Sequence, residues 1–281
     1  MMSSGHYALS VDDNIWWLAE LAAGEYASLF DHPFLAVFRR AHELYDAKVR
    51  LNLFYEVSGD APRAQKYRGF NLSMMPERYK AEFAANADWL HLAFHARREF
   101  PDAPYISAGY EEVAEDCALI HREICRFAGE ASLERATTVH FGECSTPGRE
   151  ALRDQGVHTL MGYMTLNAAG KPFVSYELSP EQINAVRQSN FWHNVEDGIR
   201  YGAILAVMNL LSPAEIAAQL DRAQTENPRR RFVEIMIHEQ YFYDDYKNYE
   251  PDFEERIMAG CRWCCEHGMQ GIFAEDAVRM Y

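Results

Sequence analysis

Acidic and histidine side chains stand directly after two short apolar segments of the chain. Asp12 and Asp13 follow the segment Tyr7 to Val11, and His238 follows the almost wholly apolar run Phe232 to Ile237. Adjacent carboxylates repel each other, so one is commonly held by a cation while the other stays free as a base. A histidine has a pKa near working pH and can act as a general acid or base. The same aspartate pair also fits a turn or a helix cap, and His238 also fits a capping or packing role.

A second group of metal-binding residue types lies in and after the segment Asp88 to Phe94. His91 and His95 are four residues apart, which on a helix would place them on one face, about 6 Å apart. In a strand, four steps of about 3.3 Å separate them by about 13 Å, too far to share one ion. We interpret the segment as a strand, so only His95 reaches its end, and Glu99 could fold back beside it. His95 and Glu99 would suit one divalent ion, although His95 also fits a core position.

Further polar and aromatic side chains follow two other predicted strands. The β-branched segment Thr137 to Phe141 carries His140 near its end and is followed by Glu143. Tyr241 lies three residues after His238 in a stretch where aromatic and acidic residues mix. Such a tyrosine either lines a subsite for a sugar-like molecule or packs its loop against the rest of the fold.

Three of the six cysteines, Cys261, Cys264 and Cys265, look like half of a zinc site. They fall in a helical pattern without a second cysteine or histidine pair nearby, so we interpret them as a buried helix face. Residues Met1 to Ser10 show no basic start followed by an apolar stretch, so no signal peptide is predicted. Cysteines without such a signal indicate reduced thiols and a cytoplasmic protein.

The elements that must position these residues alternate between short strands and longer helices. The apolar spacing predicts strands over 7–11, 49–57, 88–94, 137–141, 231–237 and 270–273, and helices over 33–46, 76–86, 110–129, 147–155, 212–225 and 251–267. Such alternation indicates parallel strands joined by crossover helices. Asn167 to Gly170, between two strand-like segments, predicts a hairpin inserted at 164–178.

About seven or eight strand–helix units in about 250 residues favour a distorted (β/α) barrel over two separate domains. We therefore predict one α/β domain over residues 1–281, a seven- or eight-stranded (β/α) barrel. In such barrels the chemistry lies at the C-terminal ends of the strands, where the polar residues above would converge. A doubly wound open sheet is the alternative, but no glycine-rich phosphate loop follows the first strand.

The composition limits the partners. The chain has 27 Lys and Arg against 42 Asp and Glu, a formal net charge of −15. Phosphate contacts need basic side chains, so nucleic acids and anionic membrane surfaces are excluded as expected partners. The longest apolar run, near Ala203 to Leu211, has about half the length of a membrane span. A small-molecule or carbohydrate substrate fits this charge, and a homo-oligomer is compatible with the sequence.

The ordered set of segments resembles the polysaccharide deacetylases, the NodB-like carbohydrate esterases. That family has a distorted (β/α) barrel with a strand ending Thr-Phe-Asp-Asp-Gly, to which Ser10 to Asn14 corresponds as Ser-Val-Asp-Asp-Asn. The resemblance implies Asp12 as the catalytic base and Asp13 as a metal ligand. The family's Leu-x-His motif, which ends a late strand, corresponds to Met236-Ile237-His238 and implies His238 as the general acid.

The family's His-x-x-x-His metal motif has two placements here. His91 and His95 match its letters, whereas His95 and Glu99 match its position after the strand, with Glu replacing the second His. We prefer the second placement, so the resemblance implies Asp13, His95 and Glu99 as ligands of a divalent metal. Zinc is the first expectation, and because two ligands are carboxylates, manganese, iron or cobalt could compete.

The family's third motif carries an arginine and prolines, and the stretch Val139 to Glu143 has neither. From this stretch and from the loop after His238, we expect His140, Glu143 and Tyr241 to bind substrate.

Together these residues predict a metal-dependent hydrolase that removes the acetyl group from an N-acetylated sugar or a related amide. One alternative is hydrolysis of a glycosidic or other C–N bond on the same barrel, where paired carboxylates can act without a metal. A second alternative is a binding protein that keeps the ligands without turnover.

Overall fold

A sheet of parallel strands forms the centre of the computed structural model, which describes residues 5–24 and 26–281. Along the sheet the strands follow the order β3-β2-β1-β10-β9-β5-β4. Their bounds are β1 His6–Asn14, β2 Val49–Phe54, β3 Leu90–Ala96, β4 Ala136–Thr137, β5 Thr159–Gly162, β9 Ile199–Val207 and β10 Phe232–His238. The short β11 (Gln270–Gly271) pairs with the first residues of β1. Residues 1–4, part of the N-terminal stretch analysed for a signal peptide, lie outside the described residues.

The two end strands of this order approach each other, so the sheet is nearly closed. Leu92 of β3 forms a parallel bridge with Leu133, just before β4. The Thr137 hydroxyl of β4 donates a hydrogen bond to the carbonyl of Phe94 in β3. The seven parallel strands of this order, nearly closed on themselves, confirm the predicted distorted (β/α) barrel.

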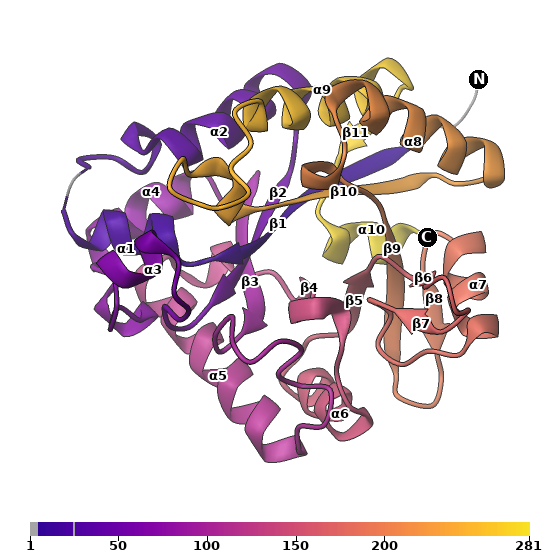
Figure 1. Cartoon of the computed structure of the whole chain (residues 1–281), viewed down its shortest axis with the longest axis horizontal. Helices are drawn as coiled ribbons and strands as arrows, with labels where there is room; N and C mark the ends of the chain where they lie inside the picture. Colours follow the sequence, from indigo (N-terminus) through magenta and orange to yellow (C-terminus); the bar gives the residue numbers. More distant parts are fainter. Residues whose placement is uncertain (1–4, 25) are drawn as a thin grey trace.

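Helices surround the barrel (Figure 1). Their bounds are α1 Trp16–Ala22, α2 Pro33–Tyr45, α3 Pro62–Lys66, α4 Lys80–Ala85, α5 Tyr110–Phe127, α6 Thr146–Asp154, α7 Pro180–Gln188, α8 Pro213–Glu226, α9 Phe253–Glu266 and α10 Ala274–Met280. α2, α9 and α8 lie side by side along one flank, and α5 packs against α6 (Figure 1). Within the described part of the chain, no helix combines the length and the apolar character that crossing a membrane requires.

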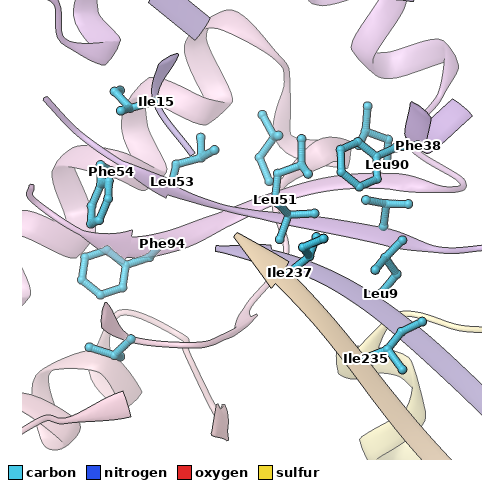
Figure 2. Packing of buried hydrophobic residues seen from close by; sticks show 14 of the residues in the cluster. Leu9, Ile15, Phe38, Leu51, Leu53, Phe54, Leu90, Phe94, Ile235 and Ile237 are labelled. Atoms are coloured by element: carbon cyan, nitrogen blue, oxygen red, sulfur yellow. The ribbon is translucent and has the colours of Figure 1, made fainter. Parts of the chain in front are cut away.

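Alternate strand residues separate two layers of the core. Leu9, Leu51, Leu90, Ile235 and Ile237 are fully buried in the main cluster, where the strands face the helices (Figure 2). The strand residues that alternate with the helix-facing ones point to the barrel interior. There a second cluster contains Ala8, Met161, Ile204 and Met236 from four different strands, together with Ala274 and Ala277 of α10. Burial of this kind stabilises the fold by about 1.5–3 kcal/mol for each large apolar side chain.

Charged side chains share the barrel interior with that second cluster. Arg50 of β2 donates from Nη2 to Oε1 of Glu234 in β10 at 2.6 Å, and Ser10 of β1 donates to the same oxygen at 2.9 Å. Arg50 is 2% exposed and Glu234 is fully buried. This network links three neighbouring strands below the C-terminal mouth of the barrel.

Several elements differ from the sequence-based expectations. The predicted strand over 137–141 ends at Thr137, and a 3₁₀ turn over His140–Gly142 follows, with Phe141 at a positive φ of 63°. Neither α7 nor the antiparallel pair of β8 (Trp192–Asn194) with β9 was predicted. The expected hairpin forms within 164–178, where β6 (Thr165–Leu166) pairs antiparallel with β7 (Pro172–Phe173).

Candidate metal centre

Three side chains, from the ends of β1 and β3 and from the 3₁₀ turn after β4, meet at the C-terminal mouth of the barrel. Oδ1 of Asp13 lies 3.0 Å from Nε2 of His95 and 3.1 Å from Nδ1 of His140. The two histidine nitrogens are 3.2 Å apart. The side chains of Asp13, His95 and His140 are only 12%, 2% and 7% exposed. This group of potential ligands is therefore compact and almost closed to solvent.

An irregularity of β1 turns Asp13 toward the two histidines. β1 pairs with β2 in regular register up to Val11 and Leu51, but the next pair is Asn14 with Leu53. β1 thus carries one extra residue here, the feature of a β-bulge, and Asp13 has a φ of 66°. A bulge re-aims side chains at the rim of a barrel, and it lets the adjacent residues Asp12 and Asp13 point in different directions.

Backbone carbonyls determine which histidine nitrogens are free to bind an ion. Nδ1 of His95 lies 2.5 Å from the carbonyl oxygen of Thr138, and Nε2 of His140 lies 2.9 Å from that of Glu99. A carbonyl oxygen can only accept, so these two nitrogens carry the hydrogens. In each neutral ring the other nitrogen then presents a lone pair. Two lone pairs and one carboxylate oxygen therefore face one another, an arrangement that only a cation or a shared proton makes favourable.

The spacing of the three atoms fits a first-row divalent ion. With bonds of about 2.0–2.1 Å and angles of about 90–109°, neighbouring ligands lie about 2.8–3.4 Å apart. The separations of 3.0, 3.1 and 3.2 Å fall in this range. The hydrogen bonds from the distal ring nitrogens to carbonyls are the outer-shell contacts by which metal-binding histidines are usually oriented. Asp13, His95 and His140 therefore fit a metal site.

The electrostatics of the group agree with that fit. Burial alone would raise the pKa of the Asp13 carboxyl, but the charge and hydrogen bond of His140 and the hydrogen bond of His95 hold this pKa well below its usual value. Burial would lower the pKa of His95, but the charge of Asp12 and the hydrogen bond with Asp13 outweigh it and raise the pKa. The centre therefore favours positive charge between the ring nitrogens and the carboxylate.

Asp12 and His238 flank this centre from adjacent parallel strands, where they are register partners. Asp12 is 2% exposed, and its Oδ1 accepts a hydrogen bond of 2.6 Å from Nδ2 of Asn52. Nδ1 of His238 lies 2.8 Å from the side-chain oxygen of Asn209. Because that oxygen accepts, Nδ1 carries the hydrogen and Nε2 is left for proton transfer. Both residues predicted to move protons thus lie at the same mouth as the metal-binding group.

Glu99 lies beside the centre, but its carboxylate is not in the group of atoms that lie within 4.8 Å of one another. Its carbonyl orients His140 instead. Burial, with the charges of Asp13 and Asp102 added, raises the pKa of its carboxyl to about 8. The group that converges therefore contains His140 and not the Glu99 carboxylate, which was predicted to accompany His95.

His91, the other partner considered for His95, points away from the mouth. It belongs to β3, stacks on Phe273 with ring centroids 3.6 Å apart, and lies 3.6 Å from Glu134. His91 and His95 both lie in β3, so the segment is a strand, as predicted, and not the helix that would bring the two rings together. The cysteines considered as a zinc half-site lie on α9, with Cys261 and Cys264 fully buried.

The residues predicted to bind substrate have three different surroundings. His140 is a member of the metal-binding group. The Glu143 carboxyl is half-buried, and burial and the charge of Glu177 raise its pKa, while hydrogen bonds from the backbone over 174–177 act in the opposite direction. Tyr241 is half-buried, with its ring centroid 6.0 Å from that of His238. The structure thus brings Tyr241 near His238, the predicted general acid.

An open cleft of about 850 Å³ adjoins the centre. Glu99, Phe100, Asp245, Tyr246 and Lys247 are among the residues that line it. The ring of Tyr246 lies 5.4 Å from that of Tyr241 between centroids, so a row of aromatic rings runs from His238 to the cleft. Glu99 lies in the lining of this cleft, and its carbonyl contacts His140 of the metal-binding group.

Glu239, directly after His238, anchors the start of α1 and with it the bulged end of β1. Its carboxylate accepts hydrogen bonds from the backbone nitrogens of Ile15, Trp16 and Trp17 at 2.6, 3.0 and 2.7 Å. Glu239 is fully buried. It therefore satisfies backbone donors that would otherwise be left unpaired at the helix start.

We expect Glu239→Gln to destabilise the protein by about 1–3 kcal/mol, because an amide nitrogen cannot accept these bonds and leaves buried donors unpaired. Urea denaturation followed by circular dichroism measures this change. The matched control is Glu111→Gln in the exposed first turn of α5, which should change the free energy of unfolding by less than about 0.5 kcal/mol. Equal effects of the two substitutions would refute the capping role.

No protein-family model matches the sequence, and no curated protein matches it. Among solved structures, 4-alpha-glucanotransferase from Thermococcus litoralis superposes with a TM-score of 0.59 and 12% identity, over 100% of this chain and 41% of that chain. The chain thus spans about two fifths of the length of that protein. At this identity the likeness is one of fold.

Two further solved structures superpose with lower TM-scores. A family 4 acetyl xylan esterase from Clostridium thermocellum, in complex with a cobalt ion, has a TM-score of 0.46 and 11% identity over 98% of this chain and 90% of that one. The catalytic domain of peptidoglycan N-acetylglucosamine deacetylase from Eubacterium rectale has a TM-score of 0.46 and 8% identity over 98% and 91% of the two chains.

Proposed function

We propose that the chain is a metal-dependent hydrolase, a divergent relative of the polysaccharide deacetylases, that removes the acetyl group from an N-acetylated sugar or a related amide. The observation that carries this proposal is the convergence of Asp13, His95 and His140, whose ligand atoms lie within 4.8 Å of one another. In the proposed ligand set His140 replaces the predicted Glu99. Zinc is the proposed metal, because two nitrogens and one oxygen are a common ligand set of catalytic zinc sites.

The residues around the centre have separate proposed roles. A divalent ion held by Asp13, His95 and His140 would polarise the amide carbonyl and make a water molecule more acidic. Asp12 would accept the proton of the attacking water. His238, held through Nδ1 by Asn209, would donate a proton to the leaving amine. Tyr241 and Tyr246 would contact the sugar along the cleft.

The test is release of acetate by the purified protein, with zinc added, from N-acetylglucosamine and its short β-linked oligomers. We expect acetate release that is lost after incubation with EDTA and returns when zinc is added back. Asp13→Asn should show the same loss without treatment. Acetate release that persists without metal, or no release from any of these substrates, would contradict the proposed function.

A further inference from the structure

β2 presents three consecutive inward-facing residues to the groups at the mouth of the barrel. Phe54 packs against the rings of both His95 and His140, with centroids 5.1 and 4.9 Å away. Two residues before Phe54 along β2, Asn52 donates a hydrogen bond to Asp12. Two residues before Asn52, Arg50 donates a hydrogen bond to the Asn52 side chain. A single strand thus contacts the proposed metal ligands and the proposed base.

The contacts of Asn52 determine how its amide is oriented. Its Oδ1 lies 3.1 Å from Nε of Arg50 and 3.3 Å from the Thr137 hydroxyl. An arginine has only donors, so the atom that faces Arg50 must be the amide oxygen. The amide nitrogen therefore faces Asp12, and its hydrogen bond to Oδ1 of Asp12 is 2.6 Å long.

Arg50 is itself held in place. Its Nη2 donates to Glu234 at 2.6 Å, and its Nη1 lies 3.6 Å from Glu134. The side chains of Arg50, Asn52 and Glu234 are 2% exposed or less. Buried groups of this kind have few alternative rotamers, so the orientation set at Glu234 is transmitted through Arg50 to the Asn52 amide.

We propose that Asn52 is a positioning residue for hydrolysis: it holds one oxygen of the Asp12 carboxylate, with Arg50 fixing the Asn52 amide, so that the second oxygen is directed to the attacking water. This inference rests on the proposed function. Asn52 acts through Asp12 and does not contact the metal ligands' nitrogen or oxygen atoms. A carboxylate base that is fixed by one directional hydrogen bond is in the productive orientation for a larger fraction of the time. This raises kcat and leaves substrate affinity unchanged.

Asn52→Asp tests this role, because it keeps the size of the side chain and its contact with Arg50 but replaces the donor that faces Asp12 by an acceptor. We expect kcat for acetate release to fall by about 10²-fold, with KM changed by less than about threefold. Bound zinc, measured by elemental analysis, should stay equal to that of the wild type. Asn52→Ala, which removes the donor without adding charge, should show the same pattern if Asn52→Asp folds poorly.

A measurement that does not depend on activity is the effect of substitutions at positions 12 and 52, singly and together, on the melting temperature Tm. Adding Asp12→Asn to the Asn52→Asp variant restores a donor–acceptor pair, so it should raise Tm by more than it does in the wild type. The matched control is Ser132→Ala, which removes a buried hydrogen bond to the carbonyl of Ala128 outside this network and should leave kcat unchanged.

The outcomes separate the two proposals. An inactive wild type would refute the proposed function, whereas an active wild type with an equally active Asn52→Asp would refute only the positioning role. A rise in KM without a fall in kcat would also overturn it, and so would a Tm effect of Asp12→Asn that is the same in both backgrounds.

Discussion

Asp12→Asn lowers the rate of acetate release by about 10²–10⁴-fold, the usual contribution of a positioned general base. The amide has the size of the carboxylate, but it cannot accept a proton from water. Asp12 is not among the three potential ligands, so the variant should bind as much zinc as the wild type. Its fold should also persist, because the new side-chain oxygen can still accept the hydrogen bond from Asn52. Steady-state kinetics and elemental analysis on the same preparation measure both properties.

The combination of lost turnover and retained metal is the informative result. It would also argue against the alternative of a binding protein without turnover. If Asp12→Asn lost its metal together with its activity, Asp12 would be a ligand rather than a base. If it kept wild-type activity, another group would have to take the proton.

Arg50→Met should destabilise the protein by about 3–5 kcal/mol, the cost of breaking a buried ion pair by removing one partner. The substitution leaves the carboxyls of Glu234 and Glu134 without their cation in the barrel interior, where both are almost fully buried. Burial already raises the pKa of Glu234 against the opposing charge of Arg50. Guanidinium denaturation of the metal-free protein measures the loss of stability.

Two further variants test the cause of this loss. Adding Glu234→Gln to Arg50→Met removes one of the uncompensated charges and should recover part of the stability. Arg39→Met is the control, because Arg39 pairs with Glu43 on the surface, where both side chains are more than half exposed, and should cost less than about 1 kcal/mol. A loss no larger than that of the control would show that Arg50 does not hold the barrel interior together.

The barrel could be predicted because its strands are short apolar runs that end in polar residues. β1 and β10 are mostly apolar segments that meet Asp12 and His238, and these two residues are register partners in the structure. The helices were recognisable by their ends: Ser212 and Pro213 start α8, as expected from the serine cap and the proline that follows it. These signals are local, so a single sequence carries them.

His140 could not be assigned as a ligand, because the pairing of strand ends depends on how the barrel closes. The spacing of His95 and Glu99 suggested a local pair, whereas the structure joins residues 45 positions apart in the chain. A signal did exist: in a nearly closed barrel β3 and β4 are neighbours, so histidines at both ends must approach each other. The bulge that turns Asp13 inward has no comparable signal in the sequence, since it arises from the register between β1 and β2.

The segment between β5 and β10 was the least predictable part. β8 and β9 form an antiparallel pair inside a pattern that otherwise alternates strand and helix, and the apolar residues of β9 indicated only a buried run. A buried strand and a buried helix segment share that composition. Asp197-Gly198, between β8 and β9, is a hairpin turn signal that the prediction did not use.

Zinc binding to the metal-free protein tests the central claim most directly. Titration calorimetry and elemental analysis would compare the wild type with His140→Ala and Glu99→Gln. The metal centre described above predicts about one zinc per chain for the wild type and for Glu99→Gln, and an affinity at least about 10²-fold lower for His140→Ala. Zinc retained by His140→Ala but lost by Glu99→Gln would contradict the assignment of Asp13, His95 and His140, and no binding by the wild type would contradict the metal centre itself.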